Sequence, residues 1–551
     1  MTPLHPADPA RLSRRGFLAT AAAAGAGAAG ALLPDQARGS TAPAATAPPV
    51  RAFELEERTI AELQAAMSSG EHTARSLVSL YLERIDELDR QGPALRHVLD
   101  LNPDAVAIAD TLDAERKAGR LRGPLHGIPV VVKDNIDTAD RMTTTAGSLA
   151  LEGSIAARDA FIVERLRAAG AIIVAKTNLS EWANFRSTRA SSAWSSRGGQ
   201  GRNPYALDRS PCGSSSGTGG AVAASYAAVG VGTETDGSVV CPAAAMALVG
   251  IKPTLGLVSR SGIIPIAHSQ DTAGPMARTV TDAALLLGTL TGPDPRDAET
   301  APSRGHIADY TAGLDPGGLR GARIGIPRRR LFGYSEETDR IAETAIAALK
   351  DAGAVIVDPA DIPHLGEYDD SEFTVLLYEF KADLNAYLAG LGPNARIRSL
   401  ADAIRFNDEH RDRVMPFFGQ EIFHMAEAKG PLTEKEYVDA LAKNRELSRT
   451  KGIDEVMTRH RLDALVAPTG HPVWPIDLVN GDHFLGASST VAAVAGYPHI
   501  TVPMGHAFGL PVGLSFIGRA WSEPTLIRLA YAYEQLTKVR RPPDFAPSAK
   551  L

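Results

Sequence analysis

The chain has few cysteines and no long run of charge of one sign. Only two cysteines, Cys212 and Cys241, occur among 551 residues, so a disulfide-rich scaffold is excluded. The formal net charge is −7 at pH 7, and the charges are interspersed. That leaves neither the basic surface expected of a nucleic-acid-binding protein nor a polybasic membrane patch. An apolar content of 44% is ordinary for a globular enzyme.

Both cysteines lie in one glycine- and serine-rich stretch, residues 210–243. We expect them to be small buried packing residues, with a disulfide or a reactive thiol as alternatives. Cysteine and histidine form no cluster with the spacing of metal ligands, so the sequence predicts no metal. It predicts no cofactor either, since the dinucleotide-like Gly25-Ala-Gly-Ala-Ala-Gly30 has no flanking strand.

The N-terminus has the pattern of a twin-arginine export leader. Arg14 and Arg15 stand in Ser-Arg-Arg-Gly-Phe-Leu, and small apolar residues follow over 19–33. This run is too weakly hydrophobic for a transmembrane anchor and is typical of a removable leader. We expect residues 1–47 to form a leader and flexible tether, cleaved between about 37 and 47. The mature protein would then be periplasmic or extracellular, without stable membrane insertion. The alternative is a fortuitous Arg-Arg pair before an alanine-rich tail.

The leader also implies a partner and a folding compartment. The twin-arginine export machinery would carry this chain as a folded protein. Folding would therefore take place in a reducing cytoplasm, which agrees with the scarcity of cysteine. The sequence has no feature that fixes an oligomeric state.

After the leader, apolar residues alternate between helical and strand spacing. Helical spacing over 59–67 and 73–88, with Thr59 and Thr73 as N-caps, predicts two helices outside the core. Short Val- and Ile-rich runs predict buried strands in an α/β fold with a largely parallel or mixed central sheet. The predicted strands are residues 126–132, 171–175, 323–326, 355–357, 464–467, 501–503 and 512–517.

The pattern of charged and apolar residues changes in the later part of the chain. From 369 to 457 the sequence has long, charge-rich amphipathic helices, which predict a helical insertion or cap beside the sheet. We expect one domain over 48–540 that contains this insertion. Residues 541–551 are expected to be a C-terminal tail.

One lysine and two serine clusters carry the chemistry. Lys133 ends the apolar run Gly-Ile-Pro-Val-Val-Val-Lys, Ser214 lies in Pro-Cys-Gly-Ser-Ser-Ser-Gly, and Ser238 ends Gly-Thr-Glu-Thr-Asp-Gly-Ser. A serine needs a base to become a nucleophile, and a desolvated lysine can serve. The pKa of that lysine has to fall by roughly three units from its ordinary ~10.4.

These motifs resemble those of the amidase signature family of Ser-Ser-Lys amide hydrolases, and most closely its bacterial peptide amidase branch. The resemblance runs from about residue 53 to 536. Four motifs point to the branch, and they cover residues 176–187, 211–217, 232–243 and 269–279. It implies one large domain with a mixed central β-sheet, helices on both faces and a helical insertion that shapes the acyl-side substrate pocket.

The resemblance also assigns roles. It makes Ser238 the nucleophile, Ser214 the bridging serine and Lys133 the base, with a cis bond between Gly213 and Ser214. The oxyanion hole would consist of the backbone N–H groups of Thr235, Asp236, Gly237 and Ser238. Residues implied near the site are Ser215, Asp271, Trp182 and Phe185. Of these, we expect Asp271 to be structural rather than catalytic, and the two aromatic residues to be core residues or substrate contacts.

The chain departs from the common family pattern around the nucleophile. Many members read Gly-Thr-Asp-x-Gly-Gly-Ser-Ile-Arg, where this chain has Glu234 for the Asp, Asp236 for the first Gly and Val240 for the Arg. The peptide amidase branch shares these changes, so activity is still expected. Substrate inferences from arginine-bearing members do not transfer.

The implied function is hydrolysis of a carboxylic amide through an acyl-enzyme, above all of a C-terminal peptide amide to peptide and ammonia. A general or aryl amidase is the alternative within this class. A different class is a non-hydrolytic component of an amidotransferase assembly, against which the leader and the lack of a basic surface argue.

Two other serine motifs compete with this interpretation. Gly213-Ser-Ser-Ser-Gly217 matches a nucleophile elbow, with His471, His483 and His499 available downstream, but the polar residues before it do not predict the required strand. Ser448-Arg-Thr-Lys451 matches a Ser-x-x-Lys motif, but it lies on a charged helix without partner motifs.

Overall fold

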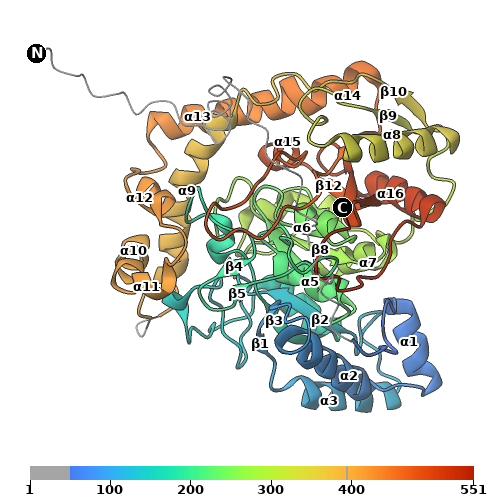
Figure 1. The fold of residues 1–551 in the computed structure, drawn as a ribbon, viewed down its shortest axis with the longest axis vertical. Helices are drawn as coiled ribbons and strands as arrows, with labels where there is room; N and C mark the ends of the chain where they lie inside the picture. Colours follow the sequence, from blue (N-terminus) through green and yellow to red (C-terminus); the bar gives the residue numbers. More distant parts are fainter. Residues whose placement is uncertain (1–49, 393–394, 551) are drawn as a thin grey trace, which may run out of the picture. The chain divides into compact units, whose positions relative to one another are not determined.

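A large mixed β-sheet forms the centre of the computed structural model, which describes residues 50–392 and 395–550 (Figure 1). Its eleven strands have the order β1-β3-β2-β6-β8-β7-β12-β13-β11-β9-β10. β2 is parallel to β3 and β6, β9 is parallel to β10 and β11, and the other neighbours are antiparallel. The strands are β1 (Val98–Leu101), β2 (Pro129–Lys133), β3 (Ile172–Thr177), β6 (Val229–Glu234), β7 (Val249–Lys252), β8 (Thr272–Ala277), β9 (Arg323–Gly325), β10 (Val355–Val357), β11 (Ala464–Pro468), β12 (His499–Ala507) and β13 (Leu510–Ile517), with β4 (Trp194–Ser195) and β5 (Gly199–Gln200) as a separate pair.

Helices cover both faces of this sheet. Helices α5 and α6 contact each other, and α7 and α8 both contact α16. Both groups contact central strands of the sheet, which places the two groups on opposite faces. The α-helices are α1 (Ile60–Ser69), α2 (Ala74–Ile85), α3 (Ala105–Lys117), α4 (Phe161–Ala168), α5 (Ser216–Ala223), α6 (Val240–Ala245), α7 (Val280–Leu290), α8 (Glu336–Asp351), α9 (Asp369–Ala389), α10 (Leu400–Glu409), α11 (Arg411–Val414), α12 (Glu421–Glu427), α13 (Lys435–Arg445), α14 (Asp454–His460), α15 (Thr490–Ala495) and α16 (Glu523–Thr537). Short 3-10 and π segments are η1 (Asp86–Arg90), η2 (Leu149–Leu151), η3 (Glu181–Asn184), η4 (Ala298–Gly305) and η5 (Glu446–Ile453).

The helices and strands predicted from apolar spacing are confirmed, with shifts of a few residues at their ends. Thr59 and Thr73 are the N-caps of α1 and α2, and each side chain accepts a hydrogen bond from the backbone of the first turn. The seven predicted strands are β2, β3, β9, β10, β11, β12 and β13. Strand β2 is buried along its whole length, as its valines indicated.

The expected insertion over 369–457 is helical. It comprises α9 to α13, the π segment η5 and most of α14, and Figure 1 shows α9 to α13 gathered beside the sheet. Helix α9 packs against α12 and α13. A separate apolar cluster joins α9, α10 and α12 to the loops around Ala146 and Trp182. The insertion is thus anchored to the domain by its own hydrophobic core.

The C-terminal residues belong to the domain rather than to a free tail. Phe545 is buried, its N–H donates to the carbonyl of Pro204 at 3.0 Å, and the N–H of Leu207 donates to the carbonyl of Ala546 at 2.8 Å. The structure therefore extends the packed domain past residue 540. The expected leader, residues 1–47, lies outside the described residues.

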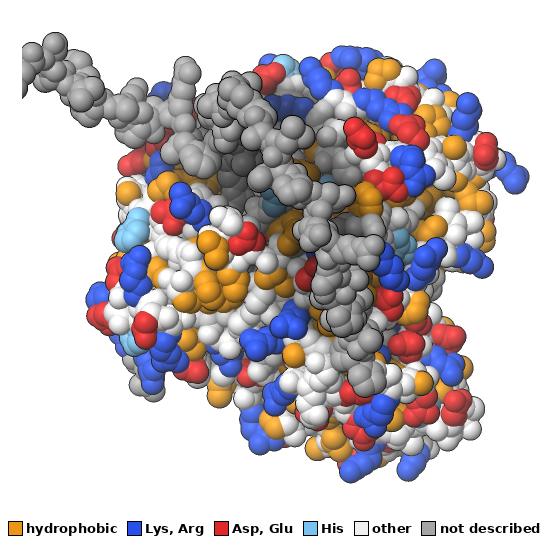
Figure 2. Space-filling view, in the orientation of Figure 1, with side chains coloured by type: hydrophobic (Ala, Val, Ile, Leu, Met, Phe, Trp, Pro, Cys, Tyr) orange, Lys and Arg blue, Asp and Glu red, His pale blue; other side chains and the backbone are white. Residues whose placement is uncertain are grey.

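The surface carries no large region of one charge on the face seen in Figure 2, where basic and acidic side chains of the described residues are mixed. Within the described part of the chain, no helix has both the length and the apolar character needed to cross a membrane.

The two cysteines form a disulfide, which corrects the expectation of unbonded packing residues. Cys212 is bonded to Cys241, and their Cα atoms lie 6.1 Å apart. Sequence spacing could not reveal the pair, because the two residues meet only through the packing of the segment before α5 against α6. The bond closes a loop with a sequence separation of 29 residues.

Removing this bond is expected to destabilise the domain. In the chain-entropy picture a loop of this size contributes about 2–4 kcal/mol. The double variant Cys212→Ser/Cys241→Ser should lose about that much free energy of unfolding, measured by denaturant titration without reductant. Wild-type protein with added dithiothreitol should move towards the variant. An unchanged denaturation midpoint in both would contradict the prediction.

Candidate active site

The predicted catalytic residues gather at one edge of the sheet. Lys133 is the last residue of β2, and Thr233 lies near the end of the neighbouring parallel strand β6. Ser214 precedes α5, and Ser238 lies in the turn between β6 and α6. Because parallel strands end at the same edge, the lysine and both serine loops meet there, the usual position of ligand sites in such sheets.

Lys133 is fully buried and hydrogen-bonded to hydroxyl groups. Its Nζ lies 2.8 Å from Ser214 Oγ and 2.8 Å from Thr233 Oγ1. Burial lowers the pKa of Lys133 to about 7, although the negative charges of Asp271 and Glu234 act in the opposite direction. A large fraction of this lysine is therefore neutral at neutral pH and able to accept a proton.

Ser214 and Ser215 connect the lysine to the second serine loop. The peptide bond between Gly213 and Ser214 is cis, as the resemblance implied. Ser215 Oγ donates to the Thr233 carbonyl at 3.0 Å and accepts from the Thr233 N–H at 3.1 Å. The Ser215 N–H donates to the Ser238 carbonyl at 3.1 Å. Ser215 is thus a structural bridge between the loop that carries Ser214 and the turn that carries Ser238.

Ser238 lies at the end of a tight turn and is 8% exposed. Gly237 has φ +79°, and a Cβ there would lie 2.9 Å from Ser489 Oγ, so a side chain at this position would disturb the turn. Among residues 50–392 and 395–550, the N–H groups of Asp236, Gly237 and Ser238 donate to no other group, and the Ser238 hydroxyl has no hydrogen bond. Consecutive unpaired N–H groups beside a serine can bind a developing oxyanion.

Two further carboxylates, Glu234 and Asp236, hold this turn. Glu234 is buried, and its Oε2 accepts from the N–H groups of Val239 at 2.8 Å and Val240 at 3.0 Å. The carboxylate of Asp236 accepts from the hydroxyl groups at the start of α15, Ser489 and Thr490. The residues that depart from the common pattern, Glu234 and Asp236, therefore fix the backbone around Ser238.

Asp271 also holds this turn. One of its oxygens accepts from the Thr235 hydroxyl at 2.6 Å, and the other accepts from the N–H groups of Ile266 and Ala267. Burial raises the pKa of Asp271 to about 6. These contacts are those of a structural partner of the turn.

Trp182 and Phe185 belong to the apolar cluster under the insertion. Trp182 packs edge-on against Phe423 at 5.7 Å between ring centroids, and Phe185 against Phe380 at 5.1 Å. Both are buried, so their packing matches the core interpretation.

A cavity of about 430 Å³ lies beside the turn. It is bounded by the ends of β2 and β6, the loop before β8, and helix α9. The polar and aromatic residues in its wall include Asn135, Thr233, Thr235, His268, Asp271 and Tyr387. Its wall includes Ala183, whereas Trp182 and Phe185 belong to the apolar cluster.

Sequence reasoning missed Thr233 and Asn135, which complete the surroundings of the lysine. Asn135 Nδ2 donates to Thr233 Oγ1 at 3.0 Å, and that hydroxyl also contacts Lys133 Nζ. The available signal was their position inside the two motifs, Lys-Asp-Asn and Gly-Thr-Glu. A second buried lysine, Lys176, donates to the carbonyl of Ile136 at 2.7 Å and is structural.

The competing serine motifs receive no support from these contacts. The elbow serine, Ser215, bonds to the Thr233 backbone, while His499 Nε2 is paired with Ser515 Oγ at 2.5 Å. Ser448 of η5 donates to the carbonyl of Asn444, at the end of α13, at 2.7 Å. No described histidine is bonded to any of these candidate nucleophiles.

Comparisons with known proteins agree with this geometry. Residues 76–527 match the Amidase family. The crystal structure of peptide amidase from Stenotrophomonas maltophilia is 54% identical, with a TM-score of 0.86 over 90% of this chain and 100% of that chain. A probable amidase of Arabidopsis thaliana is 42% identical over 90% of this chain and 92% of its own length. A component of the glutamyl-tRNA(Gln) amidotransferase of Chloroflexus aurantiacus is 37% identical over 88% and 98%, respectively. The chain therefore belongs to the amidase family of amide-hydrolysing enzymes.

Proposed function

We propose that this enzyme hydrolyses the C-terminal amide of peptides to a free carboxylate and ammonia. The observation that carries the proposal is the buried Lys133, whose Nζ lies 2.8 Å from Ser214 Oγ. The next residue, Ser215, donates its backbone N–H to the Ser238 carbonyl and so connects this pair to the turn that carries Ser238. The 54% identity to a peptide amidase over nearly the whole domain supports the substrate class. A general or aryl amidase is the alternative within the same chemistry.

In the proposed mechanism, neutral Lys133 takes the proton of Ser214 as Ser214 takes the proton of Ser238. Ser238 Oγ then attacks the amide carbon, and the N–H groups of the turn stabilise the oxyanion. The C–N bond breaks as Ser214 returns a proton to the leaving nitrogen, which departs as ammonia and leaves an ester on Ser238. Water, deprotonated by the same route, attacks the ester and releases the carboxylate.

An amidotransferase-type role has a weaker basis. The Chloroflexus aurantiacus relative shares 37% identity, and its name makes it one part of a larger enzyme. Size-exclusion chromatography of active enzyme without any partner would separate the two roles, because a hydrolase is active on its own.

A substrate panel with a nucleophile variant tests the activity. Wild-type protein should release ammonia from peptide amides faster than from aryl or short aliphatic amides. Ser238→Ala should lower kcat by roughly four to six orders of magnitude, the size of loss seen when a hydrolase nucleophile is removed. The control Ser448→Ala, which removes the serine of the competing motif, should retain wild-type activity. No ammonia from any amide would contradict the proposal.

The pH profile tests the role of Lys133. Since the base must be neutral and burial lowers its pKa to about 7, kcat/KM should fall as the pH drops below about 7. The charge of Asp271 raises the pKa of Lys133, so Asp271→Asn should move this acid limb to lower pH. The control Asp110→Asn changes an exposed carboxylate paired with Arg75 and should leave the limb in place. An acid limb that stays at the same pH in Asp271→Asn would contradict the assignment.

We also propose export by the twin-arginine route, on the basis of Arg14 and Arg15. A disulfide between Cys212 and Cys241 fits a final location in an oxidising compartment. Replacing both arginines with lysine should leave folded, active enzyme in the cytoplasm, measured by fractionation and ammonia release. Arg11→Lys, outside the motif, is the matched control and should be exported. Export of the double variant at the wild-type level would refute the proposal.

A further inference from the structure

Helix α9 of the insertion presents three carboxylates to the loop before β8. Glu372, Glu379 and Asp383 stand at positions i, i+7 and i+11 of α9, and this spacing puts them on one face of the helix. The loop comprises residues 266–271 and ends at Asp271. Asp271 holds the turn of residues 235–238, which we call the oxyanion turn because its N–H groups would bind the oxyanion.

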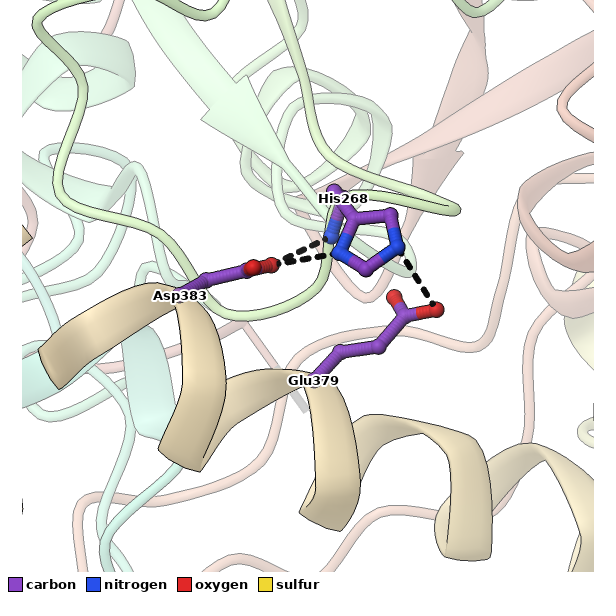
Figure 3. A group of neighbouring side chains, drawn as sticks. All are labelled: His268, Glu379 and Asp383. Carbon is purple, nitrogen blue, oxygen red and sulfur yellow. Dashed lines mark hydrogen bonds and ion pairs between the residues drawn. The ribbon is translucent and has the colours of Figure 1, made fainter. Parts of the chain in front are cut away.

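His268 sits between two of these carboxylates, as Figure 3 shows. Its Nδ1 lies 2.8 Å from Asp383 Oδ2, and its Nε2 lies 3.3 Å from Glu379 Oε1. The backbone N–H of His268 also donates to Asp383 Oδ2, at 3.0 Å. We call these three residues the α9 latch. It joins the insertion to the loop through both side-chain and backbone bonds.

The residues after His268 extend the connection to the turn itself. The Ser269 N–H donates to Glu379 Oε2 at 2.9 Å. Gln270 Nε2 donates to Glu372 Oε1 at 3.1 Å and also to the Thr235 carbonyl at 3.3 Å. A connected series of hydrogen bonds therefore links α9, through the loop, to the turn before Ser238.

The same three side chains could also hold a cation, because their ligand atoms lie within 4.8 Å of one another. Their bonds fit a latch better. Both ring nitrogens of His268 face carboxylates of the chain, and Glu379 already accepts from the Ser269 N–H and from the Tyr437 hydroxyl at 2.8 Å.

We propose that His268 is a positioning residue for amide hydrolysis: through the α9 latch and Asp271 it holds the oxyanion turn in its productive geometry. This inference rests on the proposed function, because it concerns the turn that would bind the oxyanion. It gives the insertion a role in the chemical step besides shaping the pocket.

The charges around His268 favour the imidazolium form. Glu379 and Asp383 of α9 face both ring nitrogens, and Asp271 lies in the same loop. Tyr437 of α13 donates to Glu379, while Arg260, which is paired with Asp297, also donates to the His268 carbonyl and acts against the imidazolium charge. The hydrogen bond to Asp383 and the charge of Glu379 raise the pKa of His268. The latch is therefore strongest while His268 is protonated and weakens as the pH rises through that raised pKa.

The test compares His268→Gln and Asp383→Asn with wild type in steady-state kinetics on a peptide amide. Both variants should lower kcat about tenfold, a larger factor than any change in KM from their position in the cavity wall, because a misplaced oxyanion turn costs transition-state stabilisation. The double variant should be no slower than the single ones, since both remove one connection. His364→Gln, which breaks the exposed pair with Glu367, is the matched control and should keep wild-type kcat.

The pH profile supplies a readout that a merely structural role would not move. Wild-type kcat should decline on the alkaline side as His268 loses its proton, and this limb should be absent in His268→Gln. Treatment with EDTA should change neither rate nor profile. The inference is overturned if both variants keep wild-type kcat, if they raise only KM, if the alkaline limb persists in His268→Gln, or if activity requires a divalent cation.

Failure of the proposed function would look different. If wild-type protein releases no ammonia from any amide, the function itself is wrong. A second outcome is that wild type is active, Ser238→Ala is inactive, and both latch variants match wild type. That outcome would contradict only the positioning role of His268.

Discussion

The site depends on the removal of one lysine amine from water. Lys133 completes a strand whose residues are all buried, and its Nζ contacts hydroxyl groups instead of a carboxylate. A carboxylate at contact distance would keep the lysine charged, whereas hydroxyl partners satisfy its hydrogen bonds and leave burial as the main influence on its pKa. The buried valines of β2 keep Lys133 away from water, and its uncharged surroundings are completed by Thr233 and Asn135.

The nearby carboxylates bind groups of the surrounding segments rather than Lys133 itself. Glu234, Asp236 and Asp271 each bind N–H or hydroxyl groups of the segments around the Ser238 turn. Asp271 and Glu234 affect the pKa of Lys133 less than burial does. All three carboxylates hold the turn beside the cavity. Rigid donors suit the oxyanion hole proposed for this turn, because such a site gains its effect from dipoles that do not have to reorganise.

Much of this arrangement could be predicted from the sequence. Val130 to Val132 predicted the buried strand before Lys133, and Thr59 and Thr73 predicted the helix starts, because both signals are local. The disulfide and the α9 latch could not be found this way, and the only signal for the Thr233 contact was the position of Thr233 inside its motif. Each joins residues from distant segments, and only the packing of the insertion and the loops brings them together.

The bond between Cys212 and Cys241 has a consequence for the distance between the two serines. Cys212 lies just before Ser214, and Cys241 lies in the first turn of α6 just after Ser238. The sulfur bridge therefore ties the two serine-bearing segments to each other at their outer ends, while the Ser215 N–H ties them at the inner end. Held at both ends, the segments have little freedom to separate, so the gap that a proton would cross between the hydroxyl groups in the proposed mechanism is set covalently as well as by packing.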